Sequence, residues 1–299
     1  MKVMKTLSRL SAMVLLVLVS VASAEDRLQV FAVNYPLAYF AQRIGAEHID
    51  VHFPVPPDVD PAFWQPGADE IAAFQRADLI LLNGADYAKW LKQASLPQRK
   101  LVNTSAAFQQ DYISVEATLT HQHGPGGEHS HAGTAFTTWL DFTQAVKQAA
   151  TIRAALEKKR PEHQPLFRQN FAVLEQELLA LDQSMRAIVS TAPEKPFMAS
   201  HPVYQYLARR YQIKLDSLMW EPDVIPEPGQ WRALQQRLET NPVAWMIWEG
   251  QPNAESVKRL QAMGLNSLVF EPGANVPDDG DFISVMKNNI MELEQAYQP

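Results

Sequence analysis

The stretch PLFRQNFAVLEQELLALDQSMRAIVS, residues 165–190, decides the fold because it predicts one helix that is longer than a single α/β lobe requires. Its apolar residues recur at helical spacings of three and four: Phe167, Phe171, Leu174, Leu178, Leu181, Met185 and Ile188. Pro165 suits the first turn of a helix, and Pro193 ends the pattern. At 1.5 Å per residue such a helix is about 40 Å long. It can therefore cross a whole domain.

On both sides of this helix, short apolar strands alternate with helices. Before it, we expect strands and helices at Leu28–Val33, Leu37–Ile44, Ile49–Val55, Asp69–Arg76, Leu79–Leu82, Tyr87–Leu91 and Asp141–Lys159. After it, we expect them at Pro196–Ala199, Val203–Tyr211, Ser217–Trp220, Gln230–Thr240, Trp245–Trp248, Ala254–Met263, Leu268–Phe270 and Phe282–Gln295. Strands without polar alternation indicate a parallel sheet that is covered on both faces.

The predicted fold class is therefore α/β, with two lobes that each hold a parallel sheet flanked by helices, joined by one long backbone helix. We expect an N-terminal lobe over residues 25–160, the linking helix over residues 161–192 and a C-terminal lobe over residues 193–299. In open parallel sheets, ligands bind beyond the carboxyl ends of the strands. A ligand between the lobes is the expectation.

Residues 1–24 have the pattern of a secretory signal peptide. Lys2, Lys5 and Arg9 precede the apolar run 13–21, and Ala22-Ser23-Ala24 supplies the small residues that cleavage requires. The apolar run is shorter than the roughly 20 residues of a spanning helix. We therefore expect cleavage after Ala24 and a protein exported to the periplasm.

Composition excludes several classes of function. The chain contains no cysteine, so a structural disulfide cannot stabilise it. A net charge of −7 without a basic stripe argues against nucleic acid as a partner. No motif that pairs a nucleophile with a base is visible, so we do not expect an enzyme. We expect a monomeric binding protein.

A histidine-rich tract, HQHGPGGEHSHAG at residues 121–133, holds four of the eight histidines of the chain. These are His121, His123, His129 and His131. Neutral imidazole is a good ligand for Zn²⁺, so the composition of the tract predicts metal contact. Because glycines and Pro125 separate the histidines, we expect the segment 120–133 to be a loop without helix or strand.

Several stretches resemble the zinc- and manganese-binding periplasmic solute-binding proteins that supply ABC importers, the ZnuA-like group. They run in order along the chain: NYPLAYFAQRIGAEHIDVHFPVP, DPAFWQPGADEIAAFQRADLILLNG, TTWLDF, SHPVYQYLARRYQI, LMWEP and VFEPGA. The resemblance implies a metal held between two lobes and a membrane permease as partner. It also implies Zn²⁺ as the transported ion, with Mn²⁺ as the alternative.

In that family, four loops supply four ligands, of which this chain keeps two. The resemblance assigns His201 to the third position and Glu271 to the fourth. Ala62 stands at the first position and Thr137 at the second, where the family has histidine. Two protein ligands do not make a tight tetrahedral site.

Three groups could complete the shell: the tract histidines, Asp58 or Asp60 near the first position, or water. We prefer the tract, because its glycines allow it to reach the cleft. Glu221 and Glu249 follow apolar strands, and we interpret them as partners of a ligand rather than ligands. Two other functions stay open. One is binding of an organic or metal-chelate ligand in a cleft that Trp64 covers, and the other is an extracytoplasmic zinc buffer or chaperone.

Overall fold

The structure is a computed structural model that describes residues 27–115, 120–122, 128–130 and 133–298. The expected signal peptide, with its cleavage after Ala24, lies outside the described residues. Within the described part of the chain, no helix is both long and apolar enough to cross a membrane.

The N-terminal lobe contains a four-stranded parallel sheet in the order β2-β1-β3-β4. Its strands and helices are β1 (Leu28–Ala32), α1 (Tyr35–Gly45), β2 (Ile49–His52), α2 (Ala68–Arg76), β3 (Leu79–Leu82) and β4 (Leu101–Asn103). The two inner strands are the most apolar, and Val30, Ile80 and Leu81 are fully buried. Two short antiparallel pairs follow: β5 (Ser114–Val115) with β8 (Gly133–Thr134), and β6 (Thr120–Gln122) with β7 (Glu128–Ser130).

The C-terminal lobe repeats the arrangement with a parallel sheet in the order β10-β9-β11-β12. Its elements are β9 (Pro196–Ala199), α5 (Gln205–Tyr211), β10 (Lys214–Ser217), α6 (Pro228–Thr240), β11 (Trp245–Trp248), α7 (Ala254–Ala262), β12 (Asn266–Val269) and α8 (Phe282–Tyr297). The predicted α/β class with two parallel sheets is confirmed.

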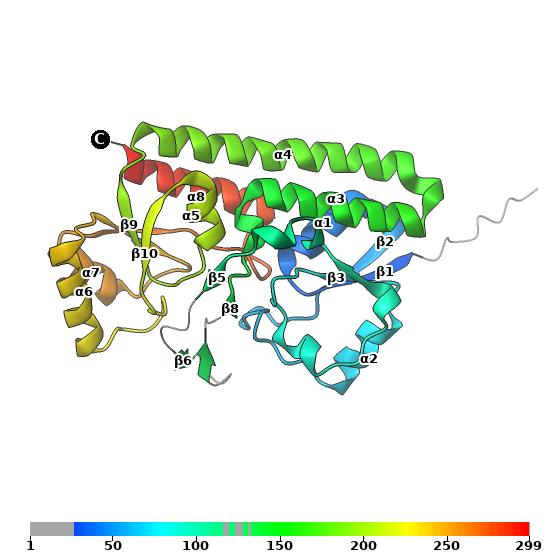
Figure 1. Cartoon of the computed structure of the whole chain (residues 1–299), viewed down its shortest axis with the longest axis horizontal. Helices are drawn as coiled ribbons and strands as arrows, with labels where there is room; N and C mark the ends of the chain where they lie inside the picture. Colours follow the sequence, from blue (N-terminus) through cyan, green and yellow to red (C-terminus); the bar gives the residue numbers. More distant parts are fainter. Residues whose placement is uncertain (1–26, 116–119, 123–127, 131–132, 299) are drawn as a thin grey trace, which may run out of the picture.

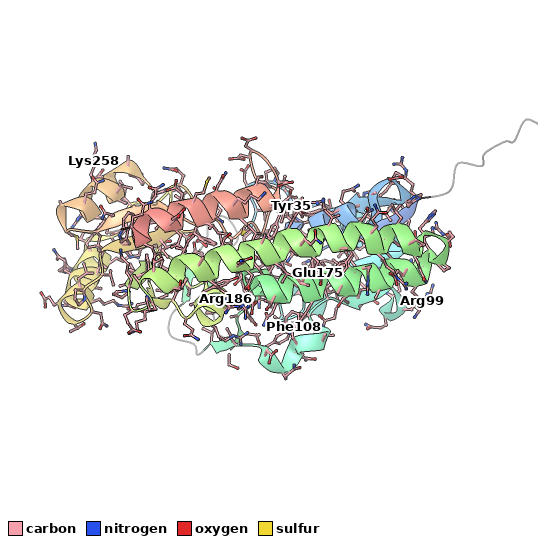
Figure 2. The ribbon with its side chains drawn as sticks, turned by 90° about the horizontal axis from the view of Figure 1, so that it is seen from above. Tyr35, Arg99, Phe108, Glu175, Arg186 and Lys258 are labelled. Carbon is pink, nitrogen blue, oxygen red and sulfur yellow. The ribbon has the colours of Figure 1, made fainter. Side chains whose placement is uncertain are left out.

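Three helices join the lobes along one side of the molecule. The helix α4 (Gln164–Thr191) runs the length of both lobes, with α3 (Phe142–Lys159) beside its first half and α8 beside its second (Figures 1 and 2). Asp141 caps α3 by accepting hydrogen bonds from the backbone N–H of Thr143 and Gln144 at 3.0 and 3.3 Å.

Polar contacts attach α4 to both lobes. Toward the N-terminal lobe, Glu177 accepts a hydrogen bond from Arg43 of α1 at 2.6 Å. Toward the C-terminal lobe, the buried Asp182 accepts two hydrogen bonds from Arg210 at 2.8 and 2.9 Å, and one from the Tyr211 hydroxyl at 3.0 Å. Charge-assisted, bidentate pairs of this kind fix orientation as well as distance. The helix therefore holds the two lobes in one relative position.

Two expected elements differ in the structure. A single 3-10 turn, Lys89–Lys92, replaces the helix expected at Tyr87–Leu91, because the N–H of Lys89 donates to the carbonyl of Ala62 instead of within a helix. The strand expected at Ser217–Trp220 lies earlier, as the sheet edge β10. There polar and apolar residues alternate and hide its signal.

The expectation of no regular structure in the histidine tract is wrong. The strands β6 and β7 pair across it, and Gly124, Pro125, Gly126 and Gly127 all fall between them. Residues that break helices and strands also suit the loop of a hairpin, so their presence did not exclude strands on either side.

Candidate metal centre

Four polar residues follow the four strands of the C-terminal sheet. His201 comes two residues after β9, Glu249 directly after β11, and Glu271 two residues after β12. Glu221 follows β10 after a short apolar segment. Because the sheet is parallel, all four lie at the edge formed by the carboxyl ends of the strands, where ligands of open α/β sheets bind.

Three of these residues form a cluster. The Nδ1 atom of His201 lies 3.7 Å from Oε1 of Glu221 and 3.6 Å from Oε1 of Glu249. One donor atom from each residue lies within 4.8 Å of the others. On a tetrahedral shell with metal–ligand distances of about 2.1 Å, neighbouring donor atoms are roughly 3.4 Å apart. The spacing of the cluster is close to that of the ligands of one ion.

The cluster is largely shielded from solvent and contains two carboxyl groups but one imidazole. His201 is 1% exposed, and the side chains of Glu221 and Glu249 are 23% and 19% exposed. Desolvation, followed by the negative charges of Glu221 and Asp60, raises the pKa of the Glu249 carboxyl well above its usual range. A divalent cation between these groups would offset the repulsion.

Glu271, predicted as a ligand, is not part of the cluster. Its backbone is held instead by Asn289 of α8, whose side chain accepts from the N–H of Glu271 at 3.0 Å and donates to its carbonyl at 2.7 Å. Desolvation and then the charges of Glu249 and Glu271 raise the pKa of the buried Tyr204 hydroxyl. The charges of both carboxylates therefore act on this tyrosine, and the ligand role of Glu271 stays a prediction.

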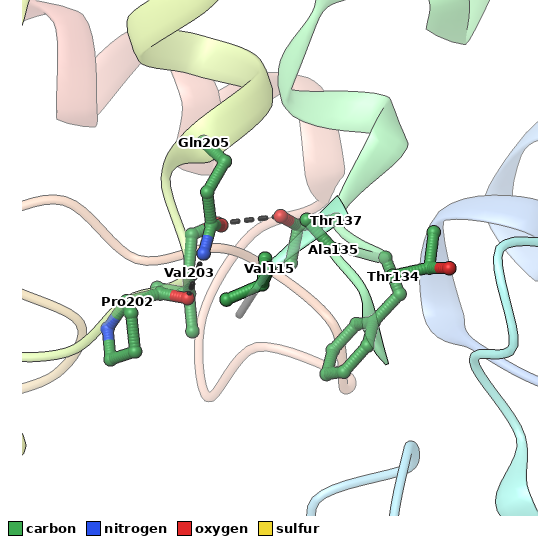
Figure 3. A pocket seen from close by; sticks show the side chains of 8 residues that line it. Val115, Thr134, Ala135, Thr137, Pro202, Val203 and Gln205 are labelled. Carbon is green, nitrogen blue, oxygen red and sulfur yellow. Dashed lines mark hydrogen bonds between the residues drawn. The ribbon is translucent and has the colours of Figure 1, made fainter. Parts of the chain in front are cut away.

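The two family positions in the N-terminal lobe have structural roles. Ala62 is fully buried, and its carbonyl accepts the hydrogen bond from Lys89. The hydroxyl of Thr137 donates to the carbonyl of Val203 at 2.5 Å, which ties the lobes together two residues after His201 (Figure 3). This bond lies at a small pocket lined by Val115, Thr134, Ala135, Phe136, Thr137, Pro202, Val203 and Gln205.

The tract histidines are described only in part. The register of β6 and β7 places His121 opposite His129, whereas His123 and His131 lie outside the described residues. Elsewhere, the rings of His48 and His163 stack with centroids 3.7 Å apart, and the exposed His52 stacks on Phe31. Contact with metal by the tract stays a prediction.

Trp64 does not support an organic ligand in the cleft. It packs against Phe74 and Trp90, with ring centroids 6.4 and 6.2 Å away, and so belongs to the core of the N-terminal lobe.

Glu221 and Glu249 are interpreted from the sequence as partners of a ligand, whereas the structure brings a carboxyl oxygen of each close to His201. Each follows a run of apolar residues, LMW and MIW, which end at the sheet edge that carries His201. A glutamate directly after an apolar, strand-like run was the signal in the sequence that could have marked each of them as a candidate ligand. The order of the strands, which places β9 between β10 and β11 and so brings both glutamates to His201, could not be read from the chain.

Comparison with known proteins identifies the family of the chain. Residues 30–296 match the family model described as "Zinc-uptake complex component A periplasmic". The chain belongs to the ZnuA family. The high-affinity zinc uptake system protein ZnuA of Bacillus subtilis is 31% identical over 294 residues, which are 93% of this chain and 90% of that protein. The family resemblance inferred from the sequence motifs is confirmed.

A further relative comes from Streptococcus pneumoniae. The zinc-binding lipoprotein AdcA is 23% identical over 306 residues, which are 99% of this chain but 61% of AdcA. The chain thus spans less than two thirds of that relative. The crystal structure of the Zn(II)-bound ZnuA-like domain of AdcA superposes with a TM-score of 0.76 at 20% identity, and the match covers 92% of this chain and 100% of the domain. This likeness supports the fold.

Proposed function

We propose that this protein captures a divalent transition metal ion, Zn²⁺ in the first instance, between its two lobes. The single observation that carries the proposal is the cluster of His201, Glu221 and Glu249, whose donor atoms have the spacing of ligands around one ion. Imidazole and carboxylate are both ligands of Zn²⁺, and carboxylate also suits Mn²⁺.

The environment of the cluster supports metal binding over a structural ion pair. Two carboxyl groups face one imidazole, and desolvation, followed by the charges of Glu221 and Asp60, raises the pKa of Glu249. Structural ion pairs in protein interiors are usually matched in charge and hydrogen-bonded. An incoming dication would supply the missing positive charge.

We further propose that the captured ion is delivered to the membrane permease of an ABC importer outside the cytoplasm. The family description names a periplasmic zinc-uptake component, and the Bacillus subtilis relative is named for high-affinity zinc uptake. The signal-peptide pattern of residues 1–24 agrees with export. In this proposal the protein is a carrier and carries out no reaction.

The test is titration of chelator-treated protein with Zn²⁺, for the wild type and for His201→Ala. Loss of the buried imidazole should weaken the tightest binding event at least about tenfold. The matched control is His52→Ala, which removes an exposed imidazole of the N-terminal lobe and should leave that event unchanged. Unchanged affinity in His201→Ala, with the thermal stability of the metal-free protein preserved, would contradict a metal site at this cluster.

A further inference from the structure

Three donors from one sheet edge leave the ion open toward the N-terminal lobe. The two family positions of that lobe cannot close it, because Ala62 has no donor atom and the hydroxyl of Thr137 is already bonded to Val203. Any ligand from the N-terminal lobe must therefore come from another residue near the cluster.

We consider Asp60, because hydrogen bonds attach the loop that precedes it to the C-terminal lobe. The side-chain amide of Asn275, four residues after Glu271, donates to the carbonyls of Pro56, Pro57 and Val59 at 2.7, 3.1 and 2.9 Å. These bonds tie the loop that leads into Asp60 to the C-terminal lobe.

The tie is reinforced by the neighbouring backbone. The N–H of Tyr35 donates to the carbonyl of Ala274 at 2.9 Å, and the indole N–H of Trp139 donates to the carbonyl of Pro272 at 2.7 Å. The segment after Glu271 is thus attached to the N-terminal lobe at several points, and the loop carrying Asp60 is held next to it.

The side chain of Asp60 is prepared for a ligand role. Its Oδ1 atom accepts a hydrogen bond from the N–H of Ala62 at 2.8 Å, which limits the directions in which the carboxylate can point. The residue itself is exposed, so an ion that reaches the protein surface here can approach its carboxylate.

A buried hydroxyl belongs to the segment that is hydrogen-bonded to the loop of Asp60. Tyr87 is 2% exposed, and its hydroxyl has no hydrogen-bond partner among the residues that the structure describes. The N–H of Lys89, two residues further on, donates to the carbonyl of Ala62, and burial and then the charge of Asp60 raise the pKa of the Tyr87 hydroxyl. A buried donor without a partner is costly, and a carboxylate drawn inward by an ion would satisfy it.

Building on the proposed function, we propose that Asp60 is the ligand that the N-terminal lobe supplies to the ion held by His201, Glu221 and Glu249. The resulting set of one imidazole and three carboxylates is richer in oxygen than a set of three imidazoles. Carboxylate donors suit Mn²⁺ better than imidazoles do, although Zn²⁺ stays the tighter ion at a given site. The site therefore accepts Mn²⁺ as well as Zn²⁺, and the Asp60 carboxylate contributes more to the binding of Mn²⁺ than to the binding of Zn²⁺.

The test uses the full chain after export and chelator treatment, titrated separately with Mn²⁺ and Zn²⁺. Asp60→Asn removes the charge but keeps a side-chain oxygen that can accept from Ala62, so the turn is preserved. This variant should bind Mn²⁺ at least about tenfold more weakly and lose less affinity for Zn²⁺. Asp58→Asn, an exposed change in the same loop, should bind both ions as the wild type does.

The outcomes separate the two proposals. Wild-type affinity for Mn²⁺ in Asp60→Asn overturns the role of Asp60 and leaves the metal site intact, provided that His201→Ala still weakens binding. Equal losses in Asp58→Asn and Asp60→Asn also overturn it, because they would indicate a general effect of loop charge. A wild type that binds neither ion contradicts the proposed function itself.

Discussion

Replacing Asp182 with alanine should destabilise the protein by about 2 to 3 kcal/mol, because this side chain joins the long helix to the C-terminal lobe. Asp182 is 6% exposed and accepts hydrogen bonds from Nε and an Nη atom of Arg210, at 2.8 and 2.9 Å. It also accepts one from the hydroxyl of Tyr211 at 3.0 Å. The substitution removes all three bonds.

The magnitude follows from what the substitution leaves behind. Breaking a fully buried ion pair costs roughly 3–5 kcal/mol. Here the side chain of Arg210 is 29% exposed, so water solvates part of the orphaned charge. Arg210 also has Asp141 within 3.8 Å as a second partner. Both facts reduce the loss of unfolding free energy, and we expect the thermal unfolding midpoint to fall by roughly 5 to 10 °C for a chain of this size.

The assay is urea unfolding of the metal-free protein, followed by circular dichroism, for Asp182→Ala, Arg210→Ala and the double variant. The double-mutant cycle should give a coupling energy of about 2 kcal/mol. As a control, Asp216→Ala breaks an exposed pair with Arg237 and should cost less than about 1 kcal/mol. If Asp182→Ala costs no more than this control, the bond network does not hold α4 to the lobe.

Three other predictions concern the N-terminal cap of α8, the ligand role of Glu271 and the histidine tract. Asp281→Ala should cost about 1 kcal/mol at neutral pH, because Asp281 caps α8 through the N–H of Ser284 at 2.8 Å. Partial burial raises the pKa of Asp281, but hydrogen bonds from Ser284 outweigh it and lower the pKa below its usual value. The stabilisation by this cap is therefore present above the unfolded-state pKa and disappears as pH falls through the folded-state pKa. Urea unfolding measured at several acidic pH values checks this pH dependence. Glu271→Gln should weaken Zn²⁺ binding less than Glu249→Gln does in calorimetry, because only Glu249 belongs to the cluster; the reverse order would restore Glu271 as the primary ligand. Because the structure leads us to propose Asp60 as the remaining ligand in place of the tract that the sequence favoured, deleting residues 120–131 should lower the number of Zn²⁺ ions bound per chain but keep the tightest event. Loss of that event would show that the tract completes the site.

The fold could be predicted because its signals are local. The 3.6-residue period of the α4 segment and the apolar run Leu79–Leu82 depend only on neighbours in the chain. The strand Leu101–Asn103 escaped prediction because it has three residues and is only partly buried. The edge strand Lys214–Ser217 was predicted three residues too late in the chain, at Ser217–Trp220, because its polar residues face solvent. Weakly buried strands carry little periodic signal.

The site could be predicted only in part, because its geometry depends on strand order. His201 was identified by its motif and lies in the cluster. Glu221 and Glu249 lie 20 and 48 positions further along the chain, and only the pairing of β9 with both β10 and β11 brings them together. The bond between Thr137 and Val203 is equally invisible in sequence, since it joins residues 66 positions apart.

The distribution of donors has a consequence for how an ion enters and leaves. When both lobes contribute equally, an ion loses half its ligands whenever the lobes separate. Here His201, Glu221 and Glu249 all belong to the C-terminal sheet edge, and the lobes are tied beside them by Thr137 and by the backbone around Asn275. With these three residues as the proposed ligands, we expect exchange of the ion without separation of the lobes. If Asp60 is the fourth ligand, as proposed, removing its charge should speed release of the ion while the C-terminal donors stay in place.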